Sequence, residues 1–135
     1  MELPEKVKAL FTKISTFAMA TVTPDGRPNV VAMARKYWFK NDLLVIGDMF
    51  MKATKQNVED NEKVSLCTWD DATGESYKLI GIGHYKTSGE ELDLANQELQ
   101  KDKPGKKFKG VVIFETKEVY EAARGKAAGD LIAGE

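Results

Sequence analysis

Apolar positions follow two different spacings along this chain. Near the N-terminus they recur every three or four residues, which predicts an amphipathic helix over about residues 3–14. Further on, β-branched and aromatic residues alternate with polar ones, which predicts strands. The helix is marked by Leu3, Val7, Leu10, Phe11 and Ile14, and the strands by residues 16–23, 29–34, 43–48, 63–69, 76–87 and 111–120, with residues 37–39 continuing the second strand.

The connections between these strands decide how they pair. Residues 24–28, 40–42 and 70–75 are polar turns that are too short for the crossover that parallel neighbours need. A parallel arrangement of alternating strands and helices is therefore disfavoured, although two further helices are predicted at about 52–61 and 90–101. Gly81 and Gly83 inside a strand predict a bulge, a barrel corner or a close approach. The pattern favours a small closed antiparallel sheet with short helices.

The length and composition are those of one ordinary globular domain. The chain has 135 residues, of which 42% are hydrophobic and 30% charged. We expect a single domain over residues 1–135, with a weakly ordered tail at 121–135 because that segment is rich in Ala and Gly.

Charge and targeting features exclude several classes of protein. The net charge is −1, so no overall field favours nucleic acid or an anionic membrane. The N-terminus lacks the apolar core of a signal peptide, and no apolar run approaches a membrane span, so we expect a cytoplasmic protein. A single Cys67 and a single His84 rule out a zinc site of Cys and His alone, and no catalytic residue is compelled by the sequence.

One segment carries candidate chemistry. Lys52, Thr54, Lys55 and Asn57 crowd the first turn of the predicted helix at 52–61, directly after a strand. A helix N-terminus presents free N–H groups and a positive dipole end, so these side chains suit a phosphate monoester. The alternative is that both lysines are simply solvated.

Three segments in this order resemble the pyridoxamine 5′-phosphate oxidase-like family of flavin-binding split β-barrels. They are the hairpin at 17–30, the basic turn and helix from Thr54 to Leu66, and Gly81-Ile-Gly-His-Tyr85 followed by a helix. The resemblance covers roughly residues 5–120. It implies a mainly β fold, a six-stranded antiparallel split β-barrel, and FMN (or F420) bound by its phosphate at the basic turn.

The resemblance also implies where the flavin ring would lie. In the family, the second and third strands hold the ring, and the matching residues are Val31, Met33, Arg35, Gly47 and Asp48. Arg35 would place positive charge near the ring, where it stabilises the reduced form. Alternatively, Arg35 is a solvated residue at a strand end and does not contact the ring, and Val31 and Met33 serve only to line the barrel interior.

The function implied is that of an FMN-binding oxidoreductase acting on a small molecule that the sequence does not identify. The alternatives are an electron carrier or other flavin-binding protein without a substrate, and an F420-dependent reductase.

We expect a homodimer with cofactor sites at its interface, because one thin barrel offers little wall for a flavin. The electron partner would be a small molecule or a redox protein.

The chain ends Ala-Gly-Asp-Leu-Ile-Ala-Gly-Glu135, without the Arg-Leu-Pro segment of the vitamin B6 oxidase, which argues against pyridoxamine 5′-phosphate as substrate. The tail is expected to reach the site if it is ordered.

Overall fold

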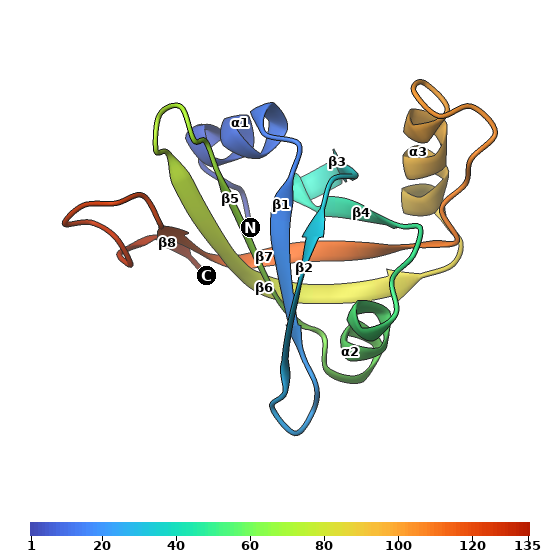
Figure 1. The fold of residues 1–135 in the computed structure, drawn as a ribbon, viewed down its shortest axis with the longest axis horizontal. Helices are drawn as coiled ribbons and strands as arrows, with labels where there is room; N and C mark the ends of the chain where they lie inside the picture. The colour runs from blue at the N-terminus through green and yellow to red at the C-terminus, as the bar shows by residue number, and fades with distance from the viewer.

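The computed structural model describes residues 1–135 and shows an antiparallel sheet curled into a half-barrel, with three short α-helices around it (Figure 1). The predicted fold class is confirmed. The elements in chain order are α1 (Glu5–Lys13), β1 (Phe17–Val22), β2 (Pro28–Met33), β3 (Lys36–Trp38), a 3₁₀ turn (Lys40–Asp42), β4 (Leu44–Asp48), α2 (Ala53–Asn61), β5 (Lys63–Trp69), β6 (Ser76–Lys86), α3 (Glu90–Leu99), β7 (Gly110–Glu121) and β8 (Leu131–Gly134).

The strand order in the sheet is β2-β1-β5-β6-β7-β4-β3, and every neighbouring pair is antiparallel. The long strand β7 pairs with β6 along one edge and with two strands in succession along the other. Its first half pairs with β4 and its last residues pair with β8. The sheet therefore has eight strands rather than the six expected.

The curl brings the two edges of the sheet together. The edge strands β2 and β3 are consecutive in the chain, and only Ala34 and Arg35 separate them. The carbonyl of Arg35 accepts a hydrogen bond from the N–H of Gly47 (3.1 Å), so the crossing segment is fastened to β4. Residues 36–38 thus begin a new strand at the opposite edge, and the expectation that residues 37–39 continue the second strand is wrong.

A glycine allows the sheet to bend at β6. The register between β6 and β7 shifts between Ile80 and Gly81. A Cβ at Gly81 would collide with the backbone carbonyl of Glu115. The sequence prediction of a bulge or close approach is confirmed at this position.

Two apolar clusters lie on opposite faces of β4. Leu44 and Ile46 face the barrel interior, which α1 covers with Val7, Leu10 and Phe11. Val45 faces the other way, against Ala95 and Leu99 of α3. Burial on both faces explains why residues 44–46 of β4 are all apolar instead of alternating with polar residues.

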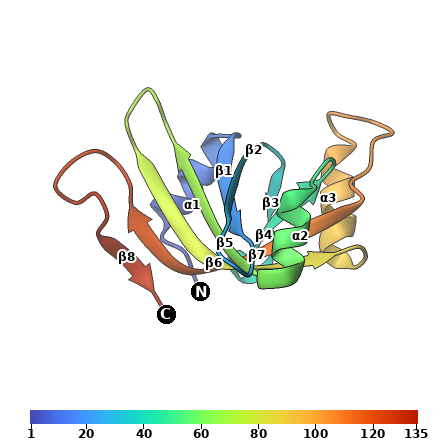
Figure 2. The same cartoon turned by 60° about the horizontal axis from the view of Figure 1, so that its bottom comes forward.

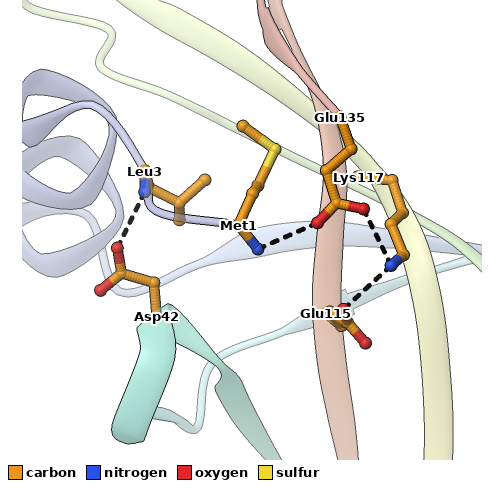
Figure 3. A network of polar contacts seen from close by, with 6 residues as sticks. All are labelled: Met1, Leu3, Asp42, Glu115, Lys117 and Glu135. Carbon is orange, nitrogen blue, oxygen red and sulfur yellow. Dashed lines mark hydrogen bonds and ion pairs between the residues drawn. The ribbon is translucent and has the colours of Figure 1, made fainter.

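Salt bridges and hydrogen bonds hold the two ends of the chain close together (Figure 3). The Glu135 carboxylate pairs with Lys117 Nζ (3.0 Å) and with the Met1 ammonium (3.3 Å). Lys117 also reaches Glu115 (2.9 Å), and the N–H of Leu3 donates to Asp42 Oδ2 (2.8 Å).

The C-terminal segment differs from expectation. Residues 131–134 form β8, and Ile132 and Ala133 pack on the main core, although Ala and Gly content predicted weak order for the tail. The pairing with β7 supplies the order that the composition does not indicate. β8 lies at the end of the sheet opposite α2 and α3 (Figure 2). No helix of the structure combines the length and apolar character that crossing a membrane requires.

Candidate functional site

A pocket of about 550 Å³ lies where β2, the turn between β4 and α2, and the segment after α3 meet. Its volume falls within the range of small-molecule and cofactor sites. Ten of its sixteen lining residues are hydrophobic, which suits a flat apolar ligand with a few polar anchors. The lining residues are Asn29, Val31, Ala32, Met33, Ala34, Arg35, Gly47, Met49, Phe50, Met51, Lys52, Ala53, Thr54, Leu99, Lys103 and Phe108.

The polar wall of the pocket is the N-terminus of α2. Lys52 is the N-cap residue, and no side chain caps the helix. The first turn-closing bond runs from the N–H of Gln56 to the carbonyl of Lys52 (3.1 Å), so the N–H groups before Gln56 have no intrahelical acceptor. Lys52, Ala53 and Thr54 line the pocket at this point. The wall therefore offers hydrogen-bond donors, a dipole end and one ammonium group to an anion.

A buried polar network fixes the side chain of Thr54. Thr54 is only 2% exposed, and its hydroxyl oxygen accepts a hydrogen bond from Asn29 Nδ2 (3.2 Å). Asn29 Nδ2 also lies 3.2 Å from Thr21 Oγ1, which accepts a second bond from Asn57 Nδ2 (3.0 Å). Because the Thr54 oxygen acts as acceptor here, its own O–H proton is left for a ligand in the pocket.

Asp48 shapes the turn that leads into α2. Its side chain is fully buried; Oδ1 accepts the N–H of Met51 (2.7 Å) and Oδ2 accepts the hydroxyl of Tyr85 (2.5 Å). Burial and the bond to Asp48 raise the pKa of Tyr85, so the hydroxyl stays a donor. The carbonyl of Asp48 accepts the N–H of Lys109 (3.1 Å), which ties the turn to the start of β7.

An ion pair lies at the pocket wall formed by the β2–β3 crossing. Arg35 Nη1 bonds Asp102, which follows α3, and Lys103 lines the pocket beside it. The hydrogen bond raises the pKa of Arg35 and lowers the pKa of the Asp102 carboxyl. Both groups stay charged at neutral pH, so Arg35 and Asp102 form an ion pair at this wall.

The structure brings together six of the nine predicted site residues. Val31, Met33, Arg35, Gly47, Lys52 and Thr54 all line the pocket.

Three predicted residues do not line the pocket. Asp48 is buried in the turn before α2, where it bonds the N–H of Met51. Asn57 is on the buried side of α2, where it bonds Thr21. Lys55 pairs with Glu59 (3.2 Å) and lies 4.9 Å from the centre of the Tyr85 ring. The helix rotates about 100° per residue, so neighbouring positions of the basic turn face different surroundings.

Sequence reasoning missed Asn29 and Phe108 as members of the site. Asn29 is a polar residue inside an apolar strand, and that signal was available in the sequence. Phe108 is the one aromatic residue in a lysine-rich loop, and a Cβ at Gly47 would collide with its ring. Only the fold shows that Gly47 leaves room for it.

Comparisons with known proteins agree with this architecture. The family model described as pyridoxamine 5′-phosphate oxidase matches residues 3–123, and the chain belongs to this family. It is 35% identical over 131 residues to the uncharacterized protein MJ0282 of Methanocaldococcus jannaschii, covering 96% of this chain and 86% of that protein.

Several solved structures share the fold. HupZ of Group A Streptococcus is 21% identical with a TM-score of 0.81, covering 94% of this chain and 99% of that chain. An FMN-binding protein of Syntrophomonas wolfei is 13% identical with a TM-score of 0.77, covering 90% and 87%. An F420 reductase has a TM-score of 0.68 (19% identical; 87% and 98%), and HutZ, the heme storage protein of Vibrio cholerae, has 0.65 (16%; 90% and 95%). At these identities the likeness shows the fold alone.

Proposed function

We propose that this chain binds FMN in the pocket, with the phosphate at the N-terminus of α2, and acts as a flavin-dependent oxidoreductase. One observation carries the proposal: a mainly apolar pocket has one wall of free helix N–H groups, a threonine hydroxyl and a lysine. FMN has a corresponding division into a flat ring system, polar only at its pyrimidine edge, and one anionic phosphate end.

The anchor residues have separate roles. Lys52 supplies charge, and the helix N–H groups supply directed donors to phosphate oxygens. Thr54 donates its hydroxyl proton, and Asn29 holds the Thr54 oxygen in place from behind. Because these hydrogen bonds hold the side chains of Asn29 and Thr54, little further ordering of the two is needed for binding.

The rest of the pocket suits a planar ring. Val31, Met33, Met49 and Phe108 present apolar surface, and Gly47 allows the Phe108 ring to pack closely against β4. Bound FMN would supply the hydride or electron transfer, while the protein orients the ring and sets its electrostatics. Arg35 places a guanidinium at the pocket wall, where it favours the reduced flavin to the extent that its partner Asp102 does not offset its charge.

F420 and heme are alternative ligands, since structures with this fold include an F420 reductase and a heme storage protein. F420 carries a similar ring system and a phosphate, so the same wall suits it. Heme is less well matched, because the single His84 lies on β6, pairs with Glu62 (2.6 Å) and does not line the pocket. The pocket therefore offers no imidazole to an iron centre.

The kind of molecule that reduces the bound flavin distinguishes an enzyme from an electron carrier. Bleaching of the bound flavin by NADH or NADPH, followed by reoxidation with a small acceptor, identifies an oxidoreductase. Reduction only by another redox protein identifies a carrier. A cytoplasmic location stays a prediction from the sequence.

We also propose a homodimer that uses the outer face of β2, β1, β5 and β6. α1 and α2 pack on the opposite face of these strands, in the main core, and Val30 and Trp69 are 67% and 46% exposed. Two apolar surface grooves, of about 550 and 230 Å³, follow the same strands. A twofold pair would bury both copies of the face.

Two measurements test these proposals. Titration of FMN into the apo protein, followed by flavin fluorescence, should saturate at one FMN per chain; absence of saturable binding would contradict the function. Sedimentation should give twice the chain mass of 15.0 kDa. Val30→Lys places two like charges in the interface and should shift the protein toward monomer, whereas Leu131→Lys on β8 should not.

A further inference from the structure

Phe50 is the most exposed large apolar side chain of the protein, at 87%, and it lines the pocket. It lies in the turn between β4 and α2. The other strongly exposed apolar residues, Val30, Trp69 and Leu131, lie on β2, β5 and β8, outside this pocket. Because Phe50 belongs to the lining of a mainly apolar pocket, a ligand bound in the pocket would lie against it.

The turn that carries Phe50 is fixed on both sides. Asp48 Oδ1 accepts the N–H of Met51 (2.7 Å), and the carbonyl of Asp48 accepts the N–H of Lys109 (3.1 Å). Lys109 Nζ lies 3.5 Å from the carbonyl of Met51. Met51 is itself buried in the main core at 7% exposure. Phe50 is therefore kept at the pocket rim, because its neighbours on both sides are anchored and it has no place in either core cluster.

The remaining lining residues leave one side of the pocket to Phe50. Val31 and Met33 pack on the main core and Phe108 is only 4% exposed, so these residues form the less exposed part of the pocket lining. The N-terminus of α2 forms the polar wall. Phe50 precedes that wall in the chain and is 87% exposed, so its side chain lies on the solvent side of the pocket.

We propose that Phe50 is a ligand-contacting residue that covers the solvent side of a planar aromatic ring bound in the pocket. The inference rests on the proposed flavin function and adds to it a residue that slows release of the ring. A contact between aromatic rings contributes about 0.5–1.5 kcal/mol beyond the area it buries. Converted to a rate, this corresponds to an approximately two- to tenfold slower dissociation.

The test compares FMN dissociation rates measured by stopped flow after mixing the loaded protein with a trap. Phe50→Ala should release FMN about two- to tenfold faster, and Phe50→Trp should restore slow release. Leu131→Ala is the matched control, since it removes an exposed apolar side chain on β8 and should leave the rate unchanged. The urea midpoint of Phe50→Ala should equal that of the unaltered protein, because no buried area is lost.

Three outcomes would overturn the inference. Equal dissociation rates for Phe50→Ala and the unaltered protein would show that Phe50 does not contact the ring, while FMN binding itself would still stand. Weaker self-association of apo Phe50→Ala in sedimentation would assign Phe50 to an interface between copies of the chain. Absence of FMN binding by the unaltered protein would remove both the proposed function and this inference.

Discussion

The hydroxyl of Tyr85 donates a 2.5 Å hydrogen bond to Oδ2 of Asp48, a carboxylate with no exposed surface. The only other donor to this carboxylate is the N–H of Met51. The pair thus joins β6 to the turn that forms one side of the pocket. Gly110 lies against the Tyr85 ring, where any Cβ would collide with it.

Tyr85→Phe should lower the free energy of unfolding by about 1–3 kcal/mol, because it leaves a buried carboxylate with one donor fewer. Urea denaturation measures this. Tyr120→Phe is the matched control: its hydroxyl bonds Glu118 (3.0 Å), which is only half-buried, so its removal should cost measurably less than loss of the bond to the fully buried Asp48. An equal decrease in the free energy of unfolding for the two variants would show that the buried Asp48 carboxylate does not depend on the Tyr85 hydroxyl.

Asp42 should make stability depend on acid pH. The N–H of Leu3 and the ammonium of Lys8 (2.6 Å) bond this carboxylate and lower its pKa in the folded protein. A lowered folded pKa gives stability that is present above the unfolded pKa of about 4 and is lost as the pH falls through the folded value. The urea midpoint should therefore fall below about pH 4, and Asp42→Asn should show a smaller fall. An unchanged pH profile in Asp42→Asn would contradict this assignment.

Two strand glycines should respond differently to alanine. At Gly81 a Cβ would collide with the Glu115 carbonyl, so Gly81→Ala should destabilise the protein by roughly 1–3 kcal/mol or more. At Gly134 the nearest atom to a Cβ is 3.6 Å away, on Leu131, so Gly134→Ala should be nearly neutral. Thermal unfolding of the two variants gives the comparison. A tolerated Gly81→Ala would mean that the β6 bulge can relax.

Truncation after Tyr120 should lower the urea midpoint, because it removes β8, the packing of Ile132 and Ala133, and the Glu135–Lys117 pair. FMN affinity should change little, since β8 lies at the far end of the sheet from α2. A large loss of affinity without loss of stability would instead place the tail of one chain over the pocket of its partner.

The sequence predicted most of the strands because their local signals agree with the fold. The hairpin turn at residues 24–28 needs glycine because Gly26 has a φ of 96°, and the β6 bulge needs it because a Cβ at Gly81 would collide with Glu115. Both glycines are visible in the sequence. The break between β2 and β3 was not predictable. Ala34 and Arg35 carry no turn signal, and only the closure of the sheet sends the chain to the opposite edge. β8 was missed because its order comes from pairing with β7, not from its composition.

The site was predictable as a segment but not residue by residue. The cluster of Lys52, Thr54, Lys55 and Asn57 correctly indicated the N-terminus of a helix, and the helix begins at Ala53. Which side chains face the pocket depends on how α2 packs against β1 and β2. Thr54 lines the pocket and is also held in a buried network by its hydrogen bond to Asn29. Nothing in the local sequence fixes that rotation.

The central claim is that the N-terminus of α2 binds a phosphate, and the two lysines there provide the most direct measurement. Lys52 lines the pocket, whereas Lys55 pairs with Glu59 and Tyr85 outside it. The dissociation constants of FMN and riboflavin should be measured by fluorescence titration for the unaltered protein, Lys52→Ala and Lys55→Ala. A charge-assisted contact contributes about 1.5–3 kcal/mol, so Lys52→Ala should weaken FMN roughly 10- to 150-fold and leave riboflavin unchanged. Lys55→Ala should change neither. Equal weakening of FMN and riboflavin by Lys52→Ala, or an effect confined to Lys55→Ala, would contradict a phosphate site in this pocket.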